Sequence, residues 1–382
     1  MITFRSEDAI SVTNSIFEWP TEGRGVLPER IFRSAIAIER KRTERSKEPF
    51  LLMLVEDCAT EDQLEDGFLD KVAQGLLQAS RETDVVGWYQ SGSAVGALFT
   101  GLTPDGDALV RDTILARLNA VLENELSDAE FSRLRISFHF FPDDWNAAES
   151  GGSSNRVLYP DLTNPGIRRQ SGLRMKRIID VAGSVLILTF CLPLYLAIAL
   201  AIKLTSKGPV LFRQTRVGQY GRPFVLYKFR TMHTNSDQAV HREYVTRMIA
   251  NQAERKPADG EGQGVYKLTN DKRITGVGNV LRRSSLDELP QILNVLMGDM
   301  SLVGPRPAIP YEVAAYQTWH RRRVLEAKPG VTGLWQVMGR SQVRFDEMVR
   351  LDLRYATSWS LWLDLKILLR TPIAVVRGAG AY

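Results

Sequence analysis

The sequence predicts an α+β protein with two folded units joined by a polar linker, the second of which begins with an apolar helix. Three observations lead to this prediction. Strand-like and helix-like hydrophobic spacings alternate in the first third of the chain. A stretch rich in Asn, Ser and Gly follows, and residues 181–202 then carry no charged side chain. The length of 382 residues fits two or more domains.

The composition is mildly basic, with 49 Lys and Arg against 44 Asp and Glu and a net charge of +5. Such a charge suits a phosphate-rich partner, but does not choose among nucleic acid, anionic lipid and a nucleotide sugar. Cys58 and Cys191 are far apart and lack metal-ligand spacing, so both are expected to be reduced and structural. The polar, acidic N-terminus is not that of a secretion signal, so export by that route is not expected.

Residues 1–145 are predicted to form the first domain, a ferredoxin-like α/β sandwich. Apolar residues spaced by three and four predict helices, and short runs of apolar or alternating residues predict strands. The expected helices are 28–40, 61–83 and 106–126, and the expected strands are 50–55, 85–89, 94–99 and 134–140. The order strand, helix, strand, strand, helix, strand is that of a ferredoxin-like sandwich.

Residues 146–172 form a predicted flexible linker, and residues 173–207 a predicted membrane segment. As a helix, residues 181–202 would rise about 33 Å, enough to cross a bilayer core. Pro193, near the middle, is expected to bend that helix. Cations flank both ends, whereas a simple span concentrates them on the cytoplasmic side. The residues leave two geometries open, a single span and a re-entrant hairpin that enters and leaves through one leaflet.

Residues 208–382 are predicted to form a small, mostly helical α/β domain, whose clearest chemical signal is Asp287-Glu288. This pair lies between Arg282-Arg283 and a Gly-Pro-Arg-Pro turn at 304–307. Carboxylates beside arginines suit phosphate chemistry. The same stretch also fits an ordinary helix with Ser284 or Ser285 as its N-cap and the acidic pair in the first turn. The spacing alone leaves both interpretations open.

Two other features have a structural explanation beside a functional one. The cations Arg213, Arg216, Arg222, Lys228 and Arg230 are interpreted for the most part as a basic surface that faces solvent or headgroups. Residues 359–370 carry two Trp and many Leu at helical spacing, which fits either a core helix or a helix in the membrane interface.

Several short motifs follow one another in order in the second half of the chain. They are Lys176-Arg177-Ile178-Ile179-Asp180, Gly208-Pro209-Val210-Leu211-Phe212, Gln214-x-Arg216-x-Gly218, Tyr227-Lys228-Phe229-Arg230-Thr231-Met232, Asp287-Glu288-Leu289-Pro290-Gln291, Gly304-Pro305-Arg306-Pro307 and Lys328-Pro329-Gly330-Val331-Thr332-Gly333. Together they resemble the bacterial sugar transferases, the monotopic phosphoglycosyl transferases that start polysaccharide assembly on a polyprenyl phosphate. The resemblance runs from Leu173 to the C-terminus. It implies the re-entrant hairpin, although Leu192 stands where the family usually has a Ser before the Pro.

The resemblance implies transfer of a sugar-1-phosphate from a UDP-sugar to undecaprenyl phosphate with release of UMP. This would be the first membrane step of exopolysaccharide, capsule or O-antigen synthesis. Asp287 would be the nucleophile, forming an aspartyl-phosphosugar intermediate, and Glu288 would handle the metal or a proton. Mg²⁺ is the expected cofactor, bound by Asp287 and Glu288. Lys228, Arg282 and Arg306 would bind phosphate or nucleotide.

The resemblance also implies a location in the bacterial inner membrane, with the catalytic domain on the cytoplasmic face. Membrane lipid is then a partner, and no nucleic acid is expected. Trp335-Gln336 and residues 359–370 are most similar to members that begin with glucose or galactose, while the residues do not fix the sugar.

The N-terminal domain has a separate resemblance. Arg81-x-x-Asp84 before a hairpin is similar to the approach to the signature turn of GGDEF domains, which make cyclic di-GMP. The turn here, residues 90–94, reads Gln-Ser-Gly-Ser-Ala and lacks the acidic pair of that chemistry. A degenerate GGDEF-like module for regulation or dimerisation is therefore expected, with a homodimer and a nucleotide ligand as open alternatives. For the whole chain, the competing hypotheses are a membrane-anchored protein that responds to a cyclic dinucleotide and a scaffold for a polysaccharide complex.

Overall fold

The computed structural model separates into two compact units, Met1–Pro142 and Asp143–Tyr382, and each is considered by itself. The described residues are 25–58, 67–102, 107–142, 156–160, 167–233, 239–250, 252, 273–339 and 343–376. Most of the predicted linker, the polar stretch 253–272 and the first part of the helix expected at 61–83 lie outside these ranges.

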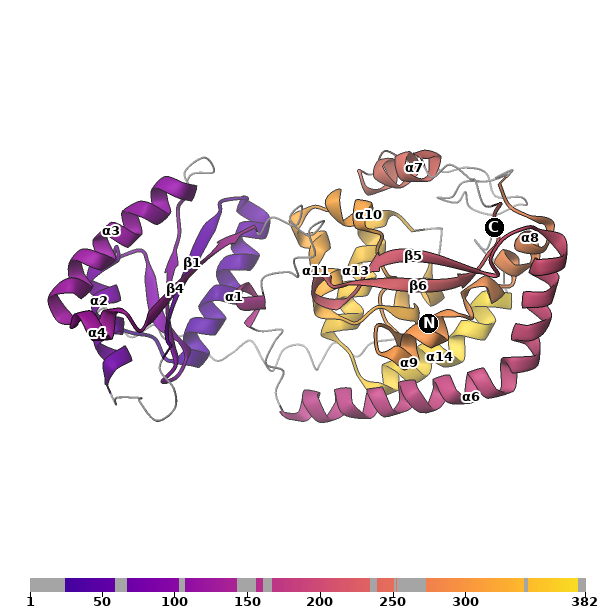
Figure 1. Cartoon of the computed structure of the whole chain (residues 1–382), viewed down its shortest axis with the longest axis horizontal. Coiled ribbons are helices and arrows are strands. Elements are labelled where there is room, and N and C mark those ends of the chain that lie inside the picture. Colours follow the sequence, from indigo (N-terminus) through magenta and orange to yellow (C-terminus); the bar gives the residue numbers. More distant parts are fainter. Residues whose placement is uncertain are drawn as a thin grey trace. The chain divides into compact units, whose positions relative to one another are not determined.

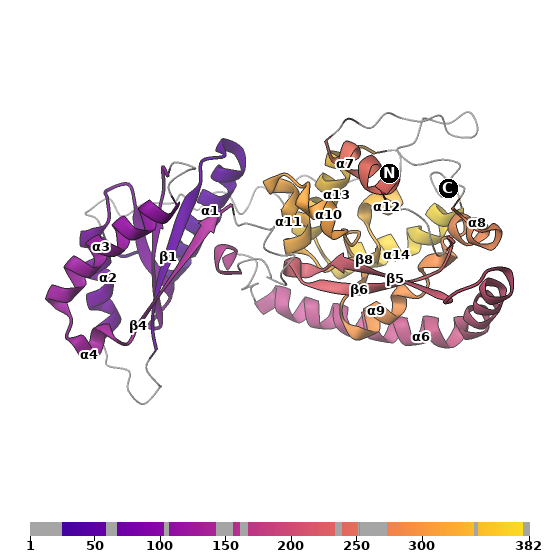
Figure 2. The ribbon, with the colours of Figure 1, turned by 45° about the horizontal axis from the view of Figure 1, so that its top comes forward.

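The N-terminal unit contains a four-stranded antiparallel sheet of order β2-β3-β1-β4. Its elements are α1 (Glu29–Ser46), β1 (Phe50–Asp57), α2 (Phe68–Ala79), β2 (Val85–Gln90), β3 (Ala94–Phe99), α3 (Asp107–Glu125), α4 (Asp128–Phe131) and β4 (Leu134–Phe141). Helices α2 and α3 cover one face of the sheet and α1 lies on the other (Figures 1 and 2). The expected strand and helix order is present, and α4 is a short helix that the sequence pattern did not indicate.

The position of α1 depends on two glycines in neighbouring strands. Gly87 of β2 pairs with Gly96 of β3. A Cβ at either glycine would lie less than 3 Å from the side chain of Phe32, which is fully buried on α1. The two glycines therefore leave room for the Phe32 ring, and a larger residue at either position would displace it.

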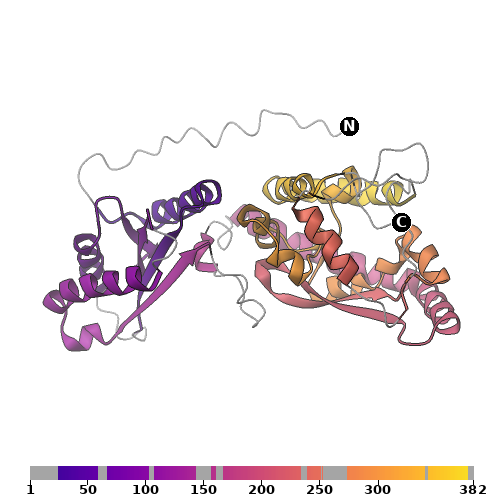
Figure 3. The same cartoon turned by 90° about the horizontal axis from the view of Figure 1, so that it is seen from above.

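The C-terminal unit is mostly helical and contains two small sheets. Its helices are α6 (Ile167–Thr205), α7 (Ala239–Ile249), α8 (Gly276–Arg283), α9 (Gln291–Met297), α10 (Pro310–Ala314), α11 (Thr318–Glu326), α12 (Leu334–Met338), α13 (Phe345–Thr357) and α14 (Leu361–Val376). Its strands are β5 (Leu211–Val217), β6 (Pro223–Phe229), β7 (Ser301–Val303) and β8 (Gly330–Thr332). The antiparallel β5–β6 ribbon and α14 lie on opposite sides of this unit (Figures 1 and 3).

Two predictions for this unit are wrong in detail. The single helix expected around 311–325 is two helices, α10 and α11, because the chain leaves helical geometry after Ala315 and restarts at Thr318. Part of the turn expected at 328–333 is strand β8, which pairs in parallel with β7. In both places tertiary packing overrides the local pattern.

Helix α6 is the apolar segment, and it differs from the prediction in two ways. It begins at Ile167, before the predicted start at Leu173, and it stays helical through Pro193 instead of separating into two helices. The helix nevertheless bends, so that its two parts run in different directions along the C-terminal unit (Figure 1). Only 11% of its most apolar 18-residue stretch is buried inside the structure. The exposed apolar residues include Phe190 (80%) and Leu196 (64%), as expected for a helix in contact with lipid.

Buried polar contacts attach the first part of α6 to the rest of the unit. Lys176 Nζ lies 2.6 Å from Asp364 Oδ2 of α14 and donates to the Val303 carbonyl at 3.0 Å. The Asp180 carboxylate accepts from Ser301 Oγ at 3.0 Å and from the Leu302 amide at 2.9 Å. Since a buried charge is tolerated only when it is paired, these contacts fix the depth at which α6 lies against the domain.

Candidate active site

The Asp287-Glu288 pair lies in a short 3₁₀ turn between α8 and α9. A Cβ at Gly278 of α8 would lie 2.1 Å from the Thr231 carbonyl oxygen, so α8 packs directly against the segment that follows β6. The chain leaves α8 through Ser285, whose φ of 57° is in the left-handed region. This tight reversal places the pair against β6.

The interpretation of this stretch as a capped helix is correct only for a single 3₁₀ turn. Ser285 is the N-cap of that turn, although its side chain makes no cap hydrogen bond, and Ser284 is the C-cap of α8. Helix α9 begins only at Gln291, after Pro290. The acidic pair is therefore not the first turn of a longer helix, and a favourable helix dipole does not explain it.

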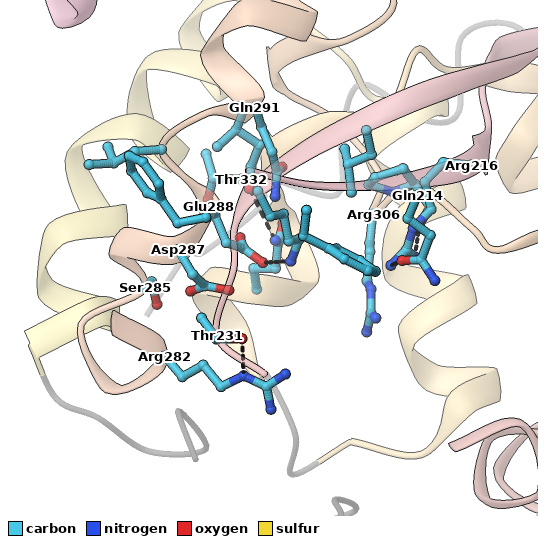
Figure 4. A pocket seen from close by; sticks show the side chains of 18 of the residues that line it. Gln214, Arg216, Thr231, Arg282, Ser285, Asp287, Glu288, Gln291, Arg306 and Thr332 are labelled. Atoms are coloured by element: carbon cyan, nitrogen blue, oxygen red, sulfur yellow. Dashed lines mark hydrogen bonds and ion pairs between the residues drawn. The ribbon is translucent and has the colours of Figure 1, made fainter. Parts of the chain in front are cut away.

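Glu288 forms an ion pair with Lys228 of β6. Lys228 Nζ lies 2.6 Å from Glu288 Oε1, and the two side chains are 23% and 35% exposed (Figure 4). Asp287 is 9% exposed. The Glu288 carboxylate is thus neutralised by Lys228, sixty positions away in the sequence. The Asp287 carboxylate lies next to it, with its oxygens toward the pocket.

The two carboxyl groups differ in their electrostatics. Burial raises the pKa of Asp287, and the charge of Glu288 raises it further, against the opposing effect of Lys228 and Arg282. Burial also acts to raise the pKa of Glu288, but the charges of Lys228, Arg306 and Arg216 outweigh it and the pKa is lowered. The pKa of Asp287 is thus shifted upward and that of Glu288 downward. A carboxylate of raised pKa is also the better nucleophile once it is ionised.

The sequence-predicted cations Lys228, Arg282 and Arg306 line the same pocket as Asp287 and Glu288, a cavity of about 1590 Å³. Arg282 donates from Nε to Thr231 Oγ1 at 2.9 Å, which orients its guanidinium below Asp287 (Figure 4). Arg306 lies on the other side of the pair, toward Gln214 and Arg216 (Figure 4). All five predicted site residues are thus brought together.

The sequence interpretation missed Arg216, which was assigned to a solvated basic surface. It is only 5% exposed and lines the pocket, and Arg230, assigned in the same way, is equally buried. Arg216 donates to the Pro307 carbonyl at 2.9 Å and to Gln214 Oε1 at 2.7 Å. Burial and the nearby charge of Arg306 lower its pKa to about 10, so it stays a cation at neutral pH. The signal that could have found it is the spacing of Gln214 and Arg216, which puts both on one face of a strand.

The turn that carries Arg306 is held by buried arginines from two sides. Besides the bond from Arg216 to Pro307, Arg323 of α11 donates to the Arg306 carbonyl at 3.2 Å. Arg323 is fixed in turn by Asp352 of α13, at 2.7 Å. The Arg306 backbone is therefore held in place, and only its side chain has to be ordered when it meets an anion.

The pocket offers a divalent cation two adjacent carboxylates. No cluster of three His, Cys, Asp or Glu side chains occurs among the described residues. A dedicated protein cage for a metal is therefore absent from that part of the chain. Mg²⁺ is usually bound by one or two carboxylates together with substrate phosphates and water, and Asp287 and Glu288 fit this type of site.

The N-terminal unit contains no comparable acidic pair at its hairpin. The Ser91 amide and hydroxyl donate to one oxygen of Glu29 on α1, at 2.8 and 2.9 Å. These bonds lower the pKa of Glu29, as does the positive charge of Arg33, while burial opposes them. In the described part of this unit, the turn is thus attached to α1.

Comparison with known proteins gives the family of the C-terminal unit. The family model described as "Bacterial sugar transferase" matches residues 171–378. An "Undecaprenyl-phosphate galactose phosphotransferase" of Salmonella typhimurium is 43% identical over 230 residues, which are 60% of this chain and 46% of that protein. A "UDP-glucose:undecaprenyl-phosphate glucose-1-phosphate transferase" of Caulobacter vibrioides is 43% identical over 242 residues, 60% of this chain and 80% of that protein.

The extent of the match differs among relatives. This chain spans about half the length of the Salmonella protein. It spans 97% of the "Exopolysaccharide production protein ExoY" of Rhizobium meliloti, at 39% identity and over 60% of its own length. Among solved structures, a DGC protein from Thermotoga maritima is 18% identical, with a TM-score of 0.25 and coverage of 31% of this chain and 85% of that one. A similarity of that size says nothing about function. Because the family model covers more than half of the residues, the chain belongs to the bacterial sugar transferase family.

Proposed function

We propose that the protein transfers a sugar-1-phosphate from a UDP-sugar to undecaprenyl phosphate and releases UMP. The observation that carries this proposal is a buried aspartate next to the Lys228–Glu288 ion pair, in a pocket that Arg216, Arg282 and Arg306 also line. The choice of donor and acceptor is supported by the names of two relatives. One name contains galactose and undecaprenyl phosphate, and the other contains UDP-glucose and undecaprenyl phosphate. We assign the reaction to the first membrane step of exopolysaccharide, capsule or O-antigen synthesis.

In the first step, an oxygen of the Asp287 carboxylate attacks the sugar-bearing phosphorus of the donor. A bond forms between this oxygen and phosphorus, the bond from phosphorus to the bridging diphosphate oxygen breaks, and UMP leaves with the electron pair. A carboxylate and a diphosphate repel each other, so cations must neutralise the charge of the donor. Arg282 and Arg306 would hold the phosphates from two sides of Asp287, and Lys228 keeps Glu288 from adding to the repulsion.

In the second step, a phosphate oxygen of undecaprenyl phosphate attacks the phosphorus of the aspartyl-phosphosugar. The bond between phosphorus and the Asp287 oxygen breaks, which regenerates the free carboxylate and gives undecaprenyl diphosphate sugar. Glu288 stays ionised in this scheme because its pKa is lowered, so it can accept a proton or hold a cation beside the reacting centre.

Mg²⁺ is the proposed cofactor, with Asp287 and Glu288 as its protein ligands. When bound, it would supply positive charge that neutralises the diphosphate and the departing UMP.

The proposal as a whole is tested by incubating the full chain in lipid nanodiscs with undecaprenyl phosphate and a panel of UDP-sugars that includes UDP-glucose and UDP-galactose. UMP release that needs Mg²⁺ and stops on addition of EDTA is expected. Absence of UMP with every donor, or equal rates with and without EDTA, would contradict the reaction or the cofactor, respectively.

For the membrane, we propose that α6 is re-entrant and that both its ends lie at the cytoplasmic face of the inner membrane. The bend of α6, the presence of Pro193 within this helix and the cations at both ends support this geometry. In a variant without Cys58 and Cys191, single cysteines introduced as R174C and K207C should both resist a membrane-impermeant maleimide in spheroplasts and react after permeabilisation. Both replaced side chains are exposed. Reaction of only one of them before permeabilisation would indicate a span.

For the N-terminal unit, we propose a regulatory or dimerisation role in place of catalysis. The hairpin turn lacks the carboxylates that diguanylate cyclase chemistry requires, and in this structure it is bonded to Glu29. Titration of the full chain with cyclic di-GMP and measurement of its mass in nanodiscs distinguish ligand binding from dimerisation.

A further inference from the structure

One partly buried polar contact joins the apolar helix α6 to the candidate catalytic turn. The Tyr195 hydroxyl donates to the Leu289 carbonyl at 2.5 Å. Leu289 directly follows the Asp287-Glu288 pair, and its carbonyl also accepts the Ile292 amide at 3.1 Å, at the beginning of α9. Tyr195 thus bonds to the backbone where the catalytic turn becomes a helix.

The ring of Tyr195 makes a second contact on the other side of the pair. Its centroid lies 5.5 Å from that of Phe229, in a tilted arrangement at 59°. Phe229 is buried and directly follows Lys228, the partner of Glu288. Tyr195 therefore contacts the residue that follows each member of the ion pair. Its ring contacts Phe229, which follows Lys228, and its hydroxyl bonds to Leu289, which follows Glu288.

The surroundings of Tyr195 are apolar. Ile198 and Ile202 follow it at helical spacing on the same face of α6, and both are buried. Leu286 and Leu289, which bracket the catalytic pair, pack into the same cluster. The pair thus extends into the pocket from a turn whose two flanking leucines rest against α6.

The bend of α6 explains why Tyr195 can reach this position. Tyr195 is two residues after Pro193, so it lies about 200° around the helix from it. A helix bends away from the side of its proline, because the ring clashes with the preceding turn. The concave side of α6 faces the rest of the unit (Figure 1), and the bond to Leu289 places Tyr195 on that side.

We propose that Tyr195 is a positioning residue, through which the bend of α6 sets the geometry of the Asp287-Glu288 turn. The expected loss of kcat rests on the proposed function, whereas the expected loosening of the turn does not. Removal of the hydroxyl leaves the Leu289 carbonyl without one of its two donors and loosens the turn, while the donor-binding arginines Arg282 and Arg306 stay in place.

The test compares Tyr195→Phe with Phe190→Leu, a matched change on the exposed side of the same helix. In nanodiscs with UDP-galactose or UDP-glucose and undecaprenyl phosphate, Tyr195→Phe should lower kcat about three- to tenfold, the range of one lost hydrogen bond. The KM for the donor should not change, and the Tm should fall by no more than the few degrees that one lost hydrogen bond accounts for. Phe190→Leu should change none of these quantities. Deuterium exchange of peptides that contain residues 286–293 should become faster in Tyr195→Phe alone.

A double-mutant cycle with Pro193→Ala tests the role of the bend. If the bend acts through Tyr195, the double variant should lose no more kcat than the more impaired single variant. Additive losses, an unchanged kcat in Tyr195→Phe, or losses of kcat and Tm together in both Tyr195→Phe and Phe190→Leu would overturn the inference. Lack of UMP release by the unaltered protein would refute the proposed function, and the exchange measurement would still decide whether Tyr195 holds the turn.

Discussion

Asp287→Asn is expected to lower UMP release at least about 10³-fold, as in other enzymes that lose their nucleophile. An amide has nearly the same shape as a carboxylate but cannot attack phosphorus, so the pocket should remain intact while the first step stops. Mass spectrometry of the full chain after incubation with the UDP-sugar alone should show a sugar phosphate on a peptide containing Asp287. The adduct should be absent from the variant.

Asp299→Asn is the matched control, because Asp299 lies close in the chain but does not line the pocket. Its rate should stay within about twofold of the unaltered protein, since Asp299 is half-buried outside the pocket and the change keeps its shape. Normal turnover of Asp287→Asn, or an adduct on another residue, would remove Asp287 from the nucleophilic role.

Glu288→Gln is expected to lower kcat about 10²-fold, a smaller loss than that of Asp287→Asn. The change breaks the 2.6 Å ion pair and leaves the Lys228 ammonium without its carboxylate. It also removes one of the two carboxylates proposed to bind Mg²⁺. Because Asp287 is unaltered, the covalent adduct should still form, only more slowly. The KM for the donor should stay the same or fall, since one negative charge near the diphosphate is lost.

Rapid-quench measurement of UMP release and of the adduct separates these effects. Glu288→Asp should recover part of the rate, because it restores the charge at a shorter reach. Glu347→Gln, at an exposed position of α13, should have no effect. A Glu288→Gln protein that forms no adduct, beside an Asp287→Asn protein that does, would show that the two roles are exchanged.

The sequence predicted most of the C-terminal site because its signals are local or belong to ordered motifs. Asp287 and Glu288 are adjacent and follow Arg282 within the same turn of chain, so their proximity needs no knowledge of the fold. Lys228 and Arg306 were assigned to the site from the family resemblance, and both line the pocket that contains Asp287 and Glu288. The helix-cap interpretation was only partly correct, since Ser285 precedes a single 3₁₀ turn in a left-handed conformation that the sequence pattern did not indicate.

The burial of Arg216 and Arg230 could not be obtained from composition. A cation on a short strand is usually solvated, but other segments of the folded chain supply the carbonyl oxygens that these two residues bind. Arg216 meets Pro307, and Arg230 meets Ser206 at the end of α6, at 2.9 Å in each case. A buried guanidinium needs several such acceptors, and the sequence pattern does not say which backbone groups are free.

By itself the sequence determined which residues are candidates for the chemistry, that an apolar helix precedes them, and that this helix contains a proline. Hydrophobic periodicity, length and adjacency are properties of neighbouring residues, and they can be read directly from the chain. Only the tertiary structure decided that Lys228 neutralises Glu288, that Arg216 and Arg323 hold the Arg306 turn, and that Tyr195 reaches the Leu289 carbonyl. These contacts join residues that are separated in the sequence, and they form because folding brings polar groups that leave water close to partners that can bond to them.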